Sequence, residues 1–370
     1  MKLEEELLEA LLRFRNFNEE IIEVLHRILH NEIDLIGRTE LFLQANAFMK
    51  TVTLTSALEL GIFDYLSGRS ATLTEIGRDL KLNKKAVGRL LYSLEAHTFV
   101  DRDLTKGRHI YRNSRLAETF LVKSKEEYLG NYLELLQKSW GYWQHLTEVM
   151  KSGKPEKHME LFKGEKELIY LYYEVANSIM SILSKELVDH LDLSNVSRVI
   201  TGEVGLTFMQ QVLSKNKDIS YVMGTLKQHA EFLDKLFKKF PLPKQPEEIS
   251  LSEKGNALND KWGSNEGYDI VFLYRKLAYK SYGESFLKKA YQVLNEDGFV
   301  IVVEPTTDSL QPSMWNLADI QLMDLMIGGA NAPALYSSDK IQKMLESIGF
   351  KNCRKIKCLG GMAIFVIGYK

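Results

Sequence analysis

The segment Ser197–Thr225 constrains the fold of this chain more than any other stretch. It contains a short apolar run, Val199-Ile200, that stops at Gly202, and a helical pattern with one apolar face follows. A second β-like run, Ile219–Met223, comes next. Strand, glycine turn, helix and strand in this order predict the first βαβ unit of an open parallel sheet, in which ligands bind outside the carboxyl ends of the strands.

The turn that would bind a ligand in this unit has few glycines and lacks the usual acid. In nucleotide-binding βαβ units a glycine-rich turn lets the backbone approach the ligand, and an acid that ends the second strand holds a ribose. Here the turn keeps only Gly202 and Gly205, and the second strand ends in Gly224-Thr225 with no acid. We expect the bulky Glu203 and the β-branched Val204 to crowd a cofactor at this turn.

Length and composition indicate a soluble protein of two domains. The chain has 370 residues, 45% of them hydrophobic and 26% charged. A formal net charge of -1 gives no reason to expect a nucleic-acid or membrane partner. No apolar run approaches the ~20 residues of a membrane span, and the acidic, amphipathic N-terminal stretch is unlike a signal peptide. We therefore expect a cytoplasmic protein.

Neither cysteines nor histidines predict a metal site. Cys353 and Cys358 are the only cysteines, and their odd spacing places them on opposite faces of a strand. Glu23, His26 and His30 share one face of a predicted helix, but no fourth protein ligand lies nearby in the sequence. We expect neither a disulfide nor a bound metal.

The first half of the chain has a winged-helix pattern. In Thr72–Leu82, Thr74 is the expected N-cap of a short helix, and Asn83 is the expected cap of a second helix that runs to Glu95. Two β-like runs then flank a polar turn, which predicts a hairpin. Helix, helix and β-ribbon in this order are typical of a winged helix. The two runs of the hairpin are Phe99-Val100 and His109–Tyr111.

A winged helix often binds DNA, but the charges here argue against it. Basic residues near the second helix are interspersed with acids, whereas duplex binding needs several phosphate contacts from each module. We expect no nucleic-acid partner. The basic residues are Lys81, Lys84, Lys85 and Arg89, and the acids are Glu75, Asp79 and Glu95.

The second half alternates strands with helices and ends in a hairpin. This pattern predicts a three-layer α/β domain, mostly parallel with an antiparallel edge. A break at Lys151–Pro155 places the domain boundary there, with a helical domain of residues 1–155 and an α/β domain of residues 156–370. The expected strands after the first βαβ unit are Tyr268–Tyr274, Phe299–Val303, Lys351–Cys358 and Met362–Tyr369, and the expected helices of this half are Leu168–Leu191, Gln228–Phe240, Ser285–Leu294, Trp315–Ile327 and Asp339–Ile348.

From about residue 45 to residue 370 the chain resembles the winged-helix small-molecule O-methyltransferases. The resemblance implies a Rossmann-like class I methyltransferase domain that follows a winged-helix domain. It also implies that the winged helix forms a homodimer and lines the substrate pocket, and that S-adenosylmethionine (SAM) lies at the carboxyl end of the first strand. The motifs that carry it, in order, are LTSALELGIFDYL, TLTEIGRDLKLNKKAVGRLLYSLE, YDIVFLYRKL, KKAYQVLNEDGFVIVVEP, QLMDLMIGG and LESIGF.

The resemblance places most of the cofactor candidates at the ends of the first two strands. The sequence departs from the family pattern at the glycine turn, and Thr225 stands where the family has the acid that holds the ribose. Aromatic and methionine side chains are candidates for contact with a flat, largely apolar ligand. The cofactor candidates are Gly202, Glu203, Gly205, Thr225 and Asp260. The substrate candidates are Trp140, Trp143, Trp315, Met323 and Met326.

The catalytic histidine of the family is absent. Its position aligns with Ala278 or with Lys276, and His229 is the last histidine of the chain. An alanine cannot move a proton, so Lys276 and Tyr279 are the candidates for that role. Glu304 matches a family acid that holds the histidine.

Three functions remain open at this stage. The first is a SAM-dependent methyltransferase for a small planar molecule, in which alignment of the reacting atoms substitutes for the histidine base. The second is a homologue that has lost SAM binding and serves another reaction or a ligand-binding role. The third is a winged-helix transcriptional regulator.

Overall fold

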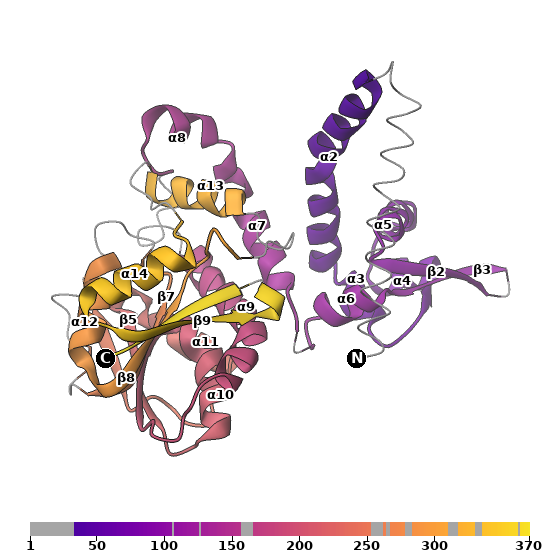
Figure 1. The fold of residues 1–370 in the computed structure, drawn as a ribbon. Coiled ribbons are helices and arrows are strands. Elements are labelled where there is room, and N and C mark those ends of the chain that lie inside the picture. Colours follow the sequence, from indigo (N-terminus) through magenta and orange to yellow (C-terminus); the bar gives the residue numbers. More distant parts are fainter. Residues whose placement is uncertain are drawn as a thin grey trace. The chain divides into compact units, whose positions relative to one another are not determined.

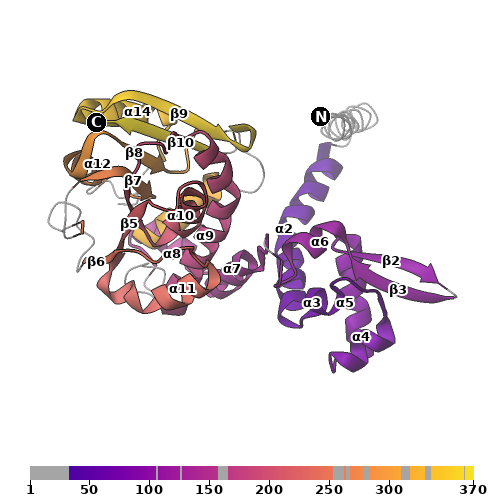
Figure 2. The same ribbon diagram turned by 90° about the horizontal axis from the view of Figure 1, so that it is seen from below.

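The computed structural model describes residues 33–105, 107–125, 127–156, 166–252, 262–263, 267–277, 283–309, 317–329, 335–361 and 363–370. The chain divides into two compact units that meet between Ser114 and Arg115. Figure 1 and Figure 2 show the elements of each unit in two orientations. Glu23, His26 and His30 lie outside the described residues.

The first unit is a winged helix. Strands β2 and β3 pair as an antiparallel hairpin, and β1 adds to the other edge of β3. Ile62, Phe63, Leu91 and Leu94 are fully buried and form much of its apolar interior. The predicted helix, helix and β-ribbon are confirmed. The elements are α2 (Ile33–Glu59), α3 (Ile62–Leu66), β1 (Ala71–Thr72), α4 (Leu73–Asp79), α5 (Lys84–Ala96), β2 (Val100–Thr105) and β3 (Arg108–Asn113).

One of the two predicted helix caps is wrong. Helix α4 is capped by Thr72 and not by Thr74, because Glu75 stands three residues after Thr72 and closes a capping box with it. The cap of α5 is as expected: the side chain of Asn83 accepts hydrogen bonds from the backbone N–H groups of Lys85 and Ala86.

The second unit alternates helices and strands. Its elements are α6 (Arg115–Phe120), α7 (Gly130–Trp143), α8 (Leu146–Ser152), α9 (Lys166–Asp189), β4 (Arg198–Gly202), η1 (Glu203–Gly205), α10 (Leu206–Lys215), β5 (Ser220–Leu226), η2 (Lys227–Phe232), α11 (Leu233–Lys239), β6 (Glu248–Ser252), β7 (Tyr268–Tyr274), α12 (Gly283–Val293), β8 (Leu294–Val303), α13 (Leu317–Gly328), α14 (Ser338–Ile348), β9 (Lys351–Cys358), η4 (Leu359–Gly361) and β10 (Ala363–Tyr369).

Among the described residues, the strands of this unit form one sheet of seven in the order β6-β5-β4-β7-β8-β10-β9. The five strands from β6 to β8 pair in parallel, and β10 is antiparallel to both of its neighbours. This confirms the predicted α/β domain with an antiparallel edge. The chain order reverses between β4 and β7, which makes the carboxyl ends of these strands the point where such sheets bind ligands.

Helices cover both faces of the sheet (Figure 2). One apolar core contains residues of α9, α10 and α11, and in it Phe208 stacks on Phe272 with ring centroids 4.4 Å apart. The other core contains residues of α12 and α14. Cys358 belongs to the first core and Cys353 packs against the second, so the two cysteines lie on opposite faces as expected.

Several element boundaries differ from the prediction. The edge strand β6 was not predicted, because Glu248–Ser252 alternates polar and apolar residues over only five positions. The segment predicted as one helix from Gln228 begins instead as η2, before α11. The division between the compact units follows Ser114, whereas the sequence placed a boundary near residue 155. Helix α7 packs along α9, so it belongs to the second unit.

In the described residues no helix has the length and apolarity of a membrane span.

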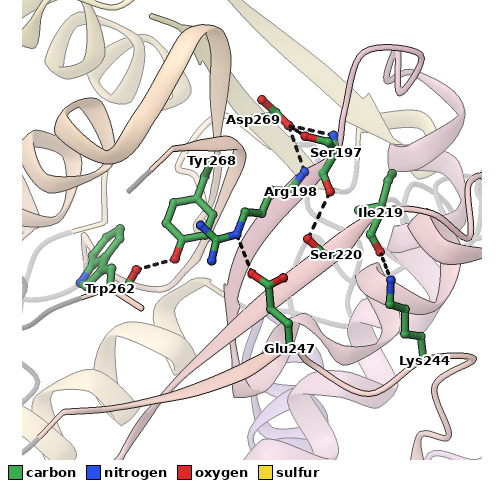
Figure 3. A network of polar contacts seen from close by, with 9 residues as sticks. All are labelled: Ser197, Arg198, Ile219, Ser220, Lys244, Glu247, Trp262, Tyr268 and Asp269. Carbon is green, nitrogen blue, oxygen red and sulfur yellow. Dashed lines mark hydrogen bonds and ion pairs between the residues drawn. The ribbon is translucent and has the colours of Figure 1, made fainter. Parts of the chain in front are cut away.

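A polar network holds the amino ends of β4, β5 and β7 together (Figure 3). The Asp269 carboxylate accepts hydrogen bonds from the backbone N–H groups of Ser197 and Arg198, at 2.8 and 3.0 Å. The Arg198 side chain pairs with Glu247 at 2.5 Å and lies over the ring of Tyr268. These groups lie at the edge opposite the ligand-binding edge, so we assign them to the stability of the sheet.

Candidate functional site

The candidate site lies at the carboxyl ends of β4, β5, β7 and β8. Gly202 and Gly224 are direct partners in the parallel ladder of β4 and β5. Paired residues of parallel strands project to the same face, so the two missing side chains would lie side by side. Both glycines are partly exposed, although the residues that flank Gly202 in β4 and η1 and those that flank Gly224 in β5 are buried.

The fold itself does not require a glycine at either position. Gly202 has φ −103° and Gly224 has no positive φ, so neither uses a conformation reserved for glycine. A Cβ on Gly202 would meet the Gly224 carbonyl oxygen at 3.7 Å, and one on Gly224 would meet the Thr201 carbonyl oxygen at 3.8 Å; both are ordinary contacts with described residues. The two glycines therefore leave room beside the sheet edge that the described residues do not fill.

Gly205 has a different role from Gly202. A Cβ at position 205 would lie 1.7 Å from the Thr201 Oγ1 atom and 2.8 Å from the Thr201 Cβ atom. Because Thr201 is buried in the middle of the sheet, Gly205 is needed for the turn to pack against β4. Gly205 is thus a structural residue, and the sequence pattern alone could not separate it from Gly202.

Glu203 and Thr225 meet across the ends of β4 and β5. The Thr225 hydroxyl donates a hydrogen bond to Glu203 Oε1 at 2.7 Å, and both residues are buried. The side-chain amide of Asn177 in α9 clamps the turn: Nδ2 donates to the Glu203 carbonyl oxygen at 2.7 Å, and Oδ1 accepts from the Leu206 backbone N–H at 3.2 Å. The turn that carries Glu203 is therefore held in one conformation.

Val204 does not lie over the glycines. Its side chain is 5% exposed and belongs to the apolar core beneath α9 and α10. No atom of Val204 lies within 4 Å of the position that a Cβ would take on Gly202. The expectation that Val204 crowds the turn is wrong, because the 3-10 turn directs this side chain into the core.

His229 also lies beside Glu203, which sequence reasoning missed. Its Nδ1 atom is 2.8 Å from the Tyr173 hydroxyl, and both side chains are buried. Burial lowers the pKa of His229, the Glu203 carboxylate opposes that decrease, and Lys276 adds to it. The resemblance places the catalytic histidine after the fourth strand, and no local pattern marks His229 as a site residue.

The end of β7 carries a buried ion pair that was not predicted. Arg275 has a left-handed backbone conformation, with φ 49°, and its backbone N–H donates to the Val303 carbonyl oxygen at 2.9 Å. Its Nη2 atom lies 2.6 and 2.8 Å from the two carboxylate oxygens of Asp324 in α13. The side chains of Arg275 and Asp324 are only 17% and 12% exposed.

Burial and this ion pair together shift the pKa values of the titratable groups at the end of β7. Burial acts to lower the pKa of Arg275, but the negative charge of Asp324 beside it acts to raise that pKa, and the guanidinium stays protonated. Burial raises the pKa of Asp324, and Arg275 opposes that increase. Burial also raises the pKa of the phenols of Tyr172 and Tyr274, which keeps both neutral at ordinary pH.

Glu304 and Lys276 lie at the same edge. Glu304 Oε1 accepts a hydrogen bond from the Leu277 backbone N–H at 2.7 Å, so it holds the turn after β7 against the end of β8. The Lys276 ammonium lies 5.6 Å from the centre of the Phe286 ring. Tyr279 and Ala278 lie outside the described residues.

Comparisons with known proteins show similarity to O-methyltransferases. The family model of the O-methyltransferase dimerisation domain matches residues 42–123. A 3-hydroxy-5-methyl-1-naphthoate 3-O-methyltransferase from Streptomyces sahachiroi is 26% identical over 174 residues, which are 45% of this chain and 49% of that protein. An acetylserotonin O-methyltransferase from Macaca mulatta is 21% identical over 83% of this chain and 90% of its own length.

A solved structure shares the fold over both units. Human N-acetylserotonin methyltransferase, crystallised in complex with SAM, superimposes with a TM-score of 0.74 at 17% identity, over 90% of this chain and 97% of that chain. Residues 42–123 thus match the O-methyltransferase dimerisation domain, and the chain is similar over most of its length to O-methyltransferases of small molecules. Its match to the first of these relatives spans about half the length of that relative.

The structure brings only some of the predicted substrate residues close to one another. Trp143 packs against the small apolar cluster of Val149 and Met326, which joins α7 and α8 to α13. Met326 has no exposed surface, so it supports this cluster from within. Trp140 and Met323 are partly exposed. Trp315 and Asp260 lie outside the described residues, and the substrate role of these five aromatic and methionine residues stays a prediction.

Proposed function

We propose that this chain is a SAM-dependent methyltransferase that acts on a small planar molecule at the carboxyl edge of its sheet. The observation that carries the proposal is the pair Gly202 and Gly224. Their missing side chains are explained neither by backbone conformation nor by packing within the described residues. Glycines of this kind indicate that another molecule approaches the backbone there.

The residues at this edge suit a nucleoside cofactor. Gly202 and Gly224 leave space against the backbone, Glu203 and Thr225 offer oxygen atoms beside it, and Val204 stays in the core. When bound, SAM supplies an activated methyl group. The part of the chain itself is to bind the nucleoside, orient the acceptor and exclude water, which together can account for much of a methyl-transfer rate.

The described groups at the end of β7 do not supply a neutral base of the histidine type. Arg275 stays protonated, and Tyr172 stays neutral because burial raises its pKa. The guanidinium is itself paired with both carboxylate oxygens of Asp324, so we assign the rate to the alignment of the reacting atoms. The curated relatives support a planar acceptor, since their names specify a naphthoate and acetylserotonin.

A second candidate is a homologue that binds a small molecule without methylating it. The observation that favours it is the locked pair of Arg275 and Asp324, which lies next to the segment where the resemblance places the missing histidine. The regulator interpretation has less support. On the wing, Arg112 lies 3.4 Å from Asp101 and also pairs with Asp103, so acids neutralise a basic side chain that DNA binding would use.

The deciding experiment is calorimetric titration of the full-length chain with S-adenosylhomocysteine, the demethylated product of SAM. We expect a dissociation constant in the micromolar range. Gly202→Ala should weaken binding about tenfold or more without lowering the thermal midpoint, because an alanine fits the fold but fills the space beside the backbone.

Gly141→Ala is the matched control. Gly141 lies in α7, and a Cβ there meets no described atom within 4 Å, so the added methyl group should leave binding unchanged. Wild-type protein that shows no heat at millimolar ligand would reject the methyltransferase proposal. Binding without methyl transfer to any hydroxylated aromatic in a screen with radiolabelled SAM would favour the non-methylating homologue.

A further inference from the structure

The Glu203 carboxylate has an unusual environment for a buried acid. The side chain is 5% exposed, and among the described residues its hydrogen-bond donor is the neutral hydroxyl of Thr225. Among the described residues no basic side chain forms an ion pair with Glu203, although the buried His229 interacts with its charge from nearby. A carboxylate offers about four lone-pair sites, so one hydroxyl leaves most of its accepting capacity available.

Neither Glu203 oxygen is among the fully buried, unpartnered atoms of the described residues, so the accepting capacity that Thr225 leaves over can be filled by water or by a ligand. A buried charge is normally compensated by an opposite charge or by several hydrogen bonds. The turn that carries Glu203 cannot swing away to solvent without breaking the two hydrogen bonds that Asn177 makes to Glu203 and Leu206. The carboxylate is therefore held in place by the fold itself.

The Glu203 carboxylate is held at the place where nucleotide-binding sites of this kind have an acid. In βαβ nucleotide sites, an acid about 20 residues after the glycine turn accepts hydrogen bonds from the ribose hydroxyls. In this chain that place at the end of β5 is taken by Thr225, which has no charge. The hydrogen bond of 2.7 Å from Thr225 holds the carboxylate of Glu203 at that same place.

The open edge lies directly beside this pair. Gly202 precedes Glu203, Gly224 precedes Thr225, and the two glycines are ladder partners. Successive side chains of a strand alternate between its faces, so the missing side chains of Gly202 and Gly224 share the face of Ile200 and Val222, whereas Thr225 follows Tyr221 and Met223 to the other face. A nucleoside that lies across the carboxyl ends of β4 and β5 can reach both the glycine backbone and the carboxylate beside Thr225.

We propose that Glu203 is the ribose-binding acid of this protein, moved from the second strand to the first turn, and that Thr225 is a positioning residue that orients its carboxylate. The ligand class is a nucleoside with two free ribose hydroxyls. The inference rests on the proposed SAM site and specifies which residues of this chain recognise the sugar.

The test compares two ligands by calorimetry on the full-length chain: S-adenosylhomocysteine and its dideoxyribose analogue, which lacks both ribose hydroxyls. Wild-type protein should prefer the ribose ligand by about tenfold or more, since hydrogen bonds to a carboxylate are among the stronger ones. Glu203→Gln keeps the shape of the side chain and should lose most of this preference. Its affinity for the dideoxyribose analogue should change little.

The positioning role of Thr225 has its own variants. Thr225→Val should reduce the ribose preference, and Thr225→Ser, which keeps the hydroxyl, should retain it. Glu231→Gln is the control, because Glu231 is a more exposed acid of η2 that pairs with Lys166. It should leave the preference unchanged.

The outcomes separate this inference from the proposed function. A wild-type protein that binds neither ligand rejects the SAM site and the inference with it. A wild-type protein that binds both ligands equally well overturns the inference alone, as does a Glu203→Gln variant that keeps the full preference. The comparison of the two ligands on wild-type protein does not depend on how well any variant folds.

Discussion

The guanidinium of Arg275 holds both carboxylate oxygens of Asp324 through one nitrogen, Nη2, at 2.6 and 2.8 Å. The pair joins the end of β7 to α13 at a place where both side chains are largely buried. A buried ion pair of this kind adds little to the free energy of unfolding compared with an apolar pair of the same shape. Removing only one partner is strongly destabilising, because the other charge stays buried without compensation. We therefore expect a single substitution in this pair to destabilise the protein more than replacement of both residues.

The first prediction is that Arg275→Met lowers the free energy of unfolding by about 3–5 kcal/mol, because it leaves the Asp324 carboxylate buried without its partner. The double variant Arg275→Met, Asp324→Leu should recover most of that loss. Urea unfolding followed by circular dichroism measures both. The exposed wing pair provides the control: Arg112→Met should cost no more than about 1 kcal/mol. A double variant as unstable as the single one would contradict the prediction.

The second prediction concerns Gly205. Gly205→Ala should destabilise the protein by at least about 1–3 kcal/mol, because the new methyl group overlaps the side chain of Thr201 within the sheet. Thr201→Ala in the same chain should restore part of the stability, since it removes the closest atom. Gly202→Ala, three residues earlier, should have a nearly normal thermal midpoint. Equal midpoints for the two alanine variants would show that the turn can relax around Thr201.

The third prediction concerns pH. Burial lowers the pKa of His229, so the unfolded chain, whose histidines have a pKa of about 6.5, takes up the proton first as the pH falls. The contribution of His229 to stability is therefore complete above that value and decreases as the pH falls toward the lower pKa of the folded state. In His229→Gln, the free energy of unfolding should decrease less between about pH 7.5 and about pH 5.5.

Chemical unfolding at several pH values in that window tests this prediction. His109→Gln is the control, because His109 is an exposed residue of β3. It should leave the pH dependence of the wild-type protein unchanged. A His229→Gln profile parallel to that of the wild type would mean that other groups determine the acid sensitivity.

The fourth prediction concerns assembly. Helix α2 carries exposed apolar side chains, among them Phe42 and Met49, at 67% and 54% exposure, and Phe42 lies at the start of the segment that matches the dimerisation domain. These two residues are seven positions apart and share a helix face. We expect a homodimer in light scattering, and the double variant Phe42→Asp, Met49→Asp should shift it to the monomer mass of 42.5 kDa.

The matched control for this surface is Leu104→Asp on β2, where the leucine is 69% exposed. It should leave the dimer intact, because a single exposed leucine on the wing does not form the apolar stripe that an obligate interface requires. A wild-type protein that is already monomeric at high concentration would contradict the assignment of α2 to the interface.

The sequence alone determined the elements whose signals are local. The apolar run Tyr268–Tyr274 forms β7 with those same limits, because a strand buried on both faces needs apolar residues at successive positions. The cap at Asn83, the hairpin of the wing and the antiparallel terminal pair were predicted for the same reason. Each depends on residues that are close together in the chain.

Only the tertiary structure decided how the site is assembled. Thr225 and Glu203 are 22 residues apart, Arg275 and Asp324 are 49 apart, and Tyr173 and His229 are 56 apart. No periodicity or spacing in the sequence links such pairs, because they meet only when β4, β5 and β7 take neighbouring places in the sheet and α9 and α13 pack at its carboxyl edge. The same holds for the two glycines of the turn. Gly205 is required by Thr201 and Gly202 is not, a difference that depends on the distance between atoms in the folded chain.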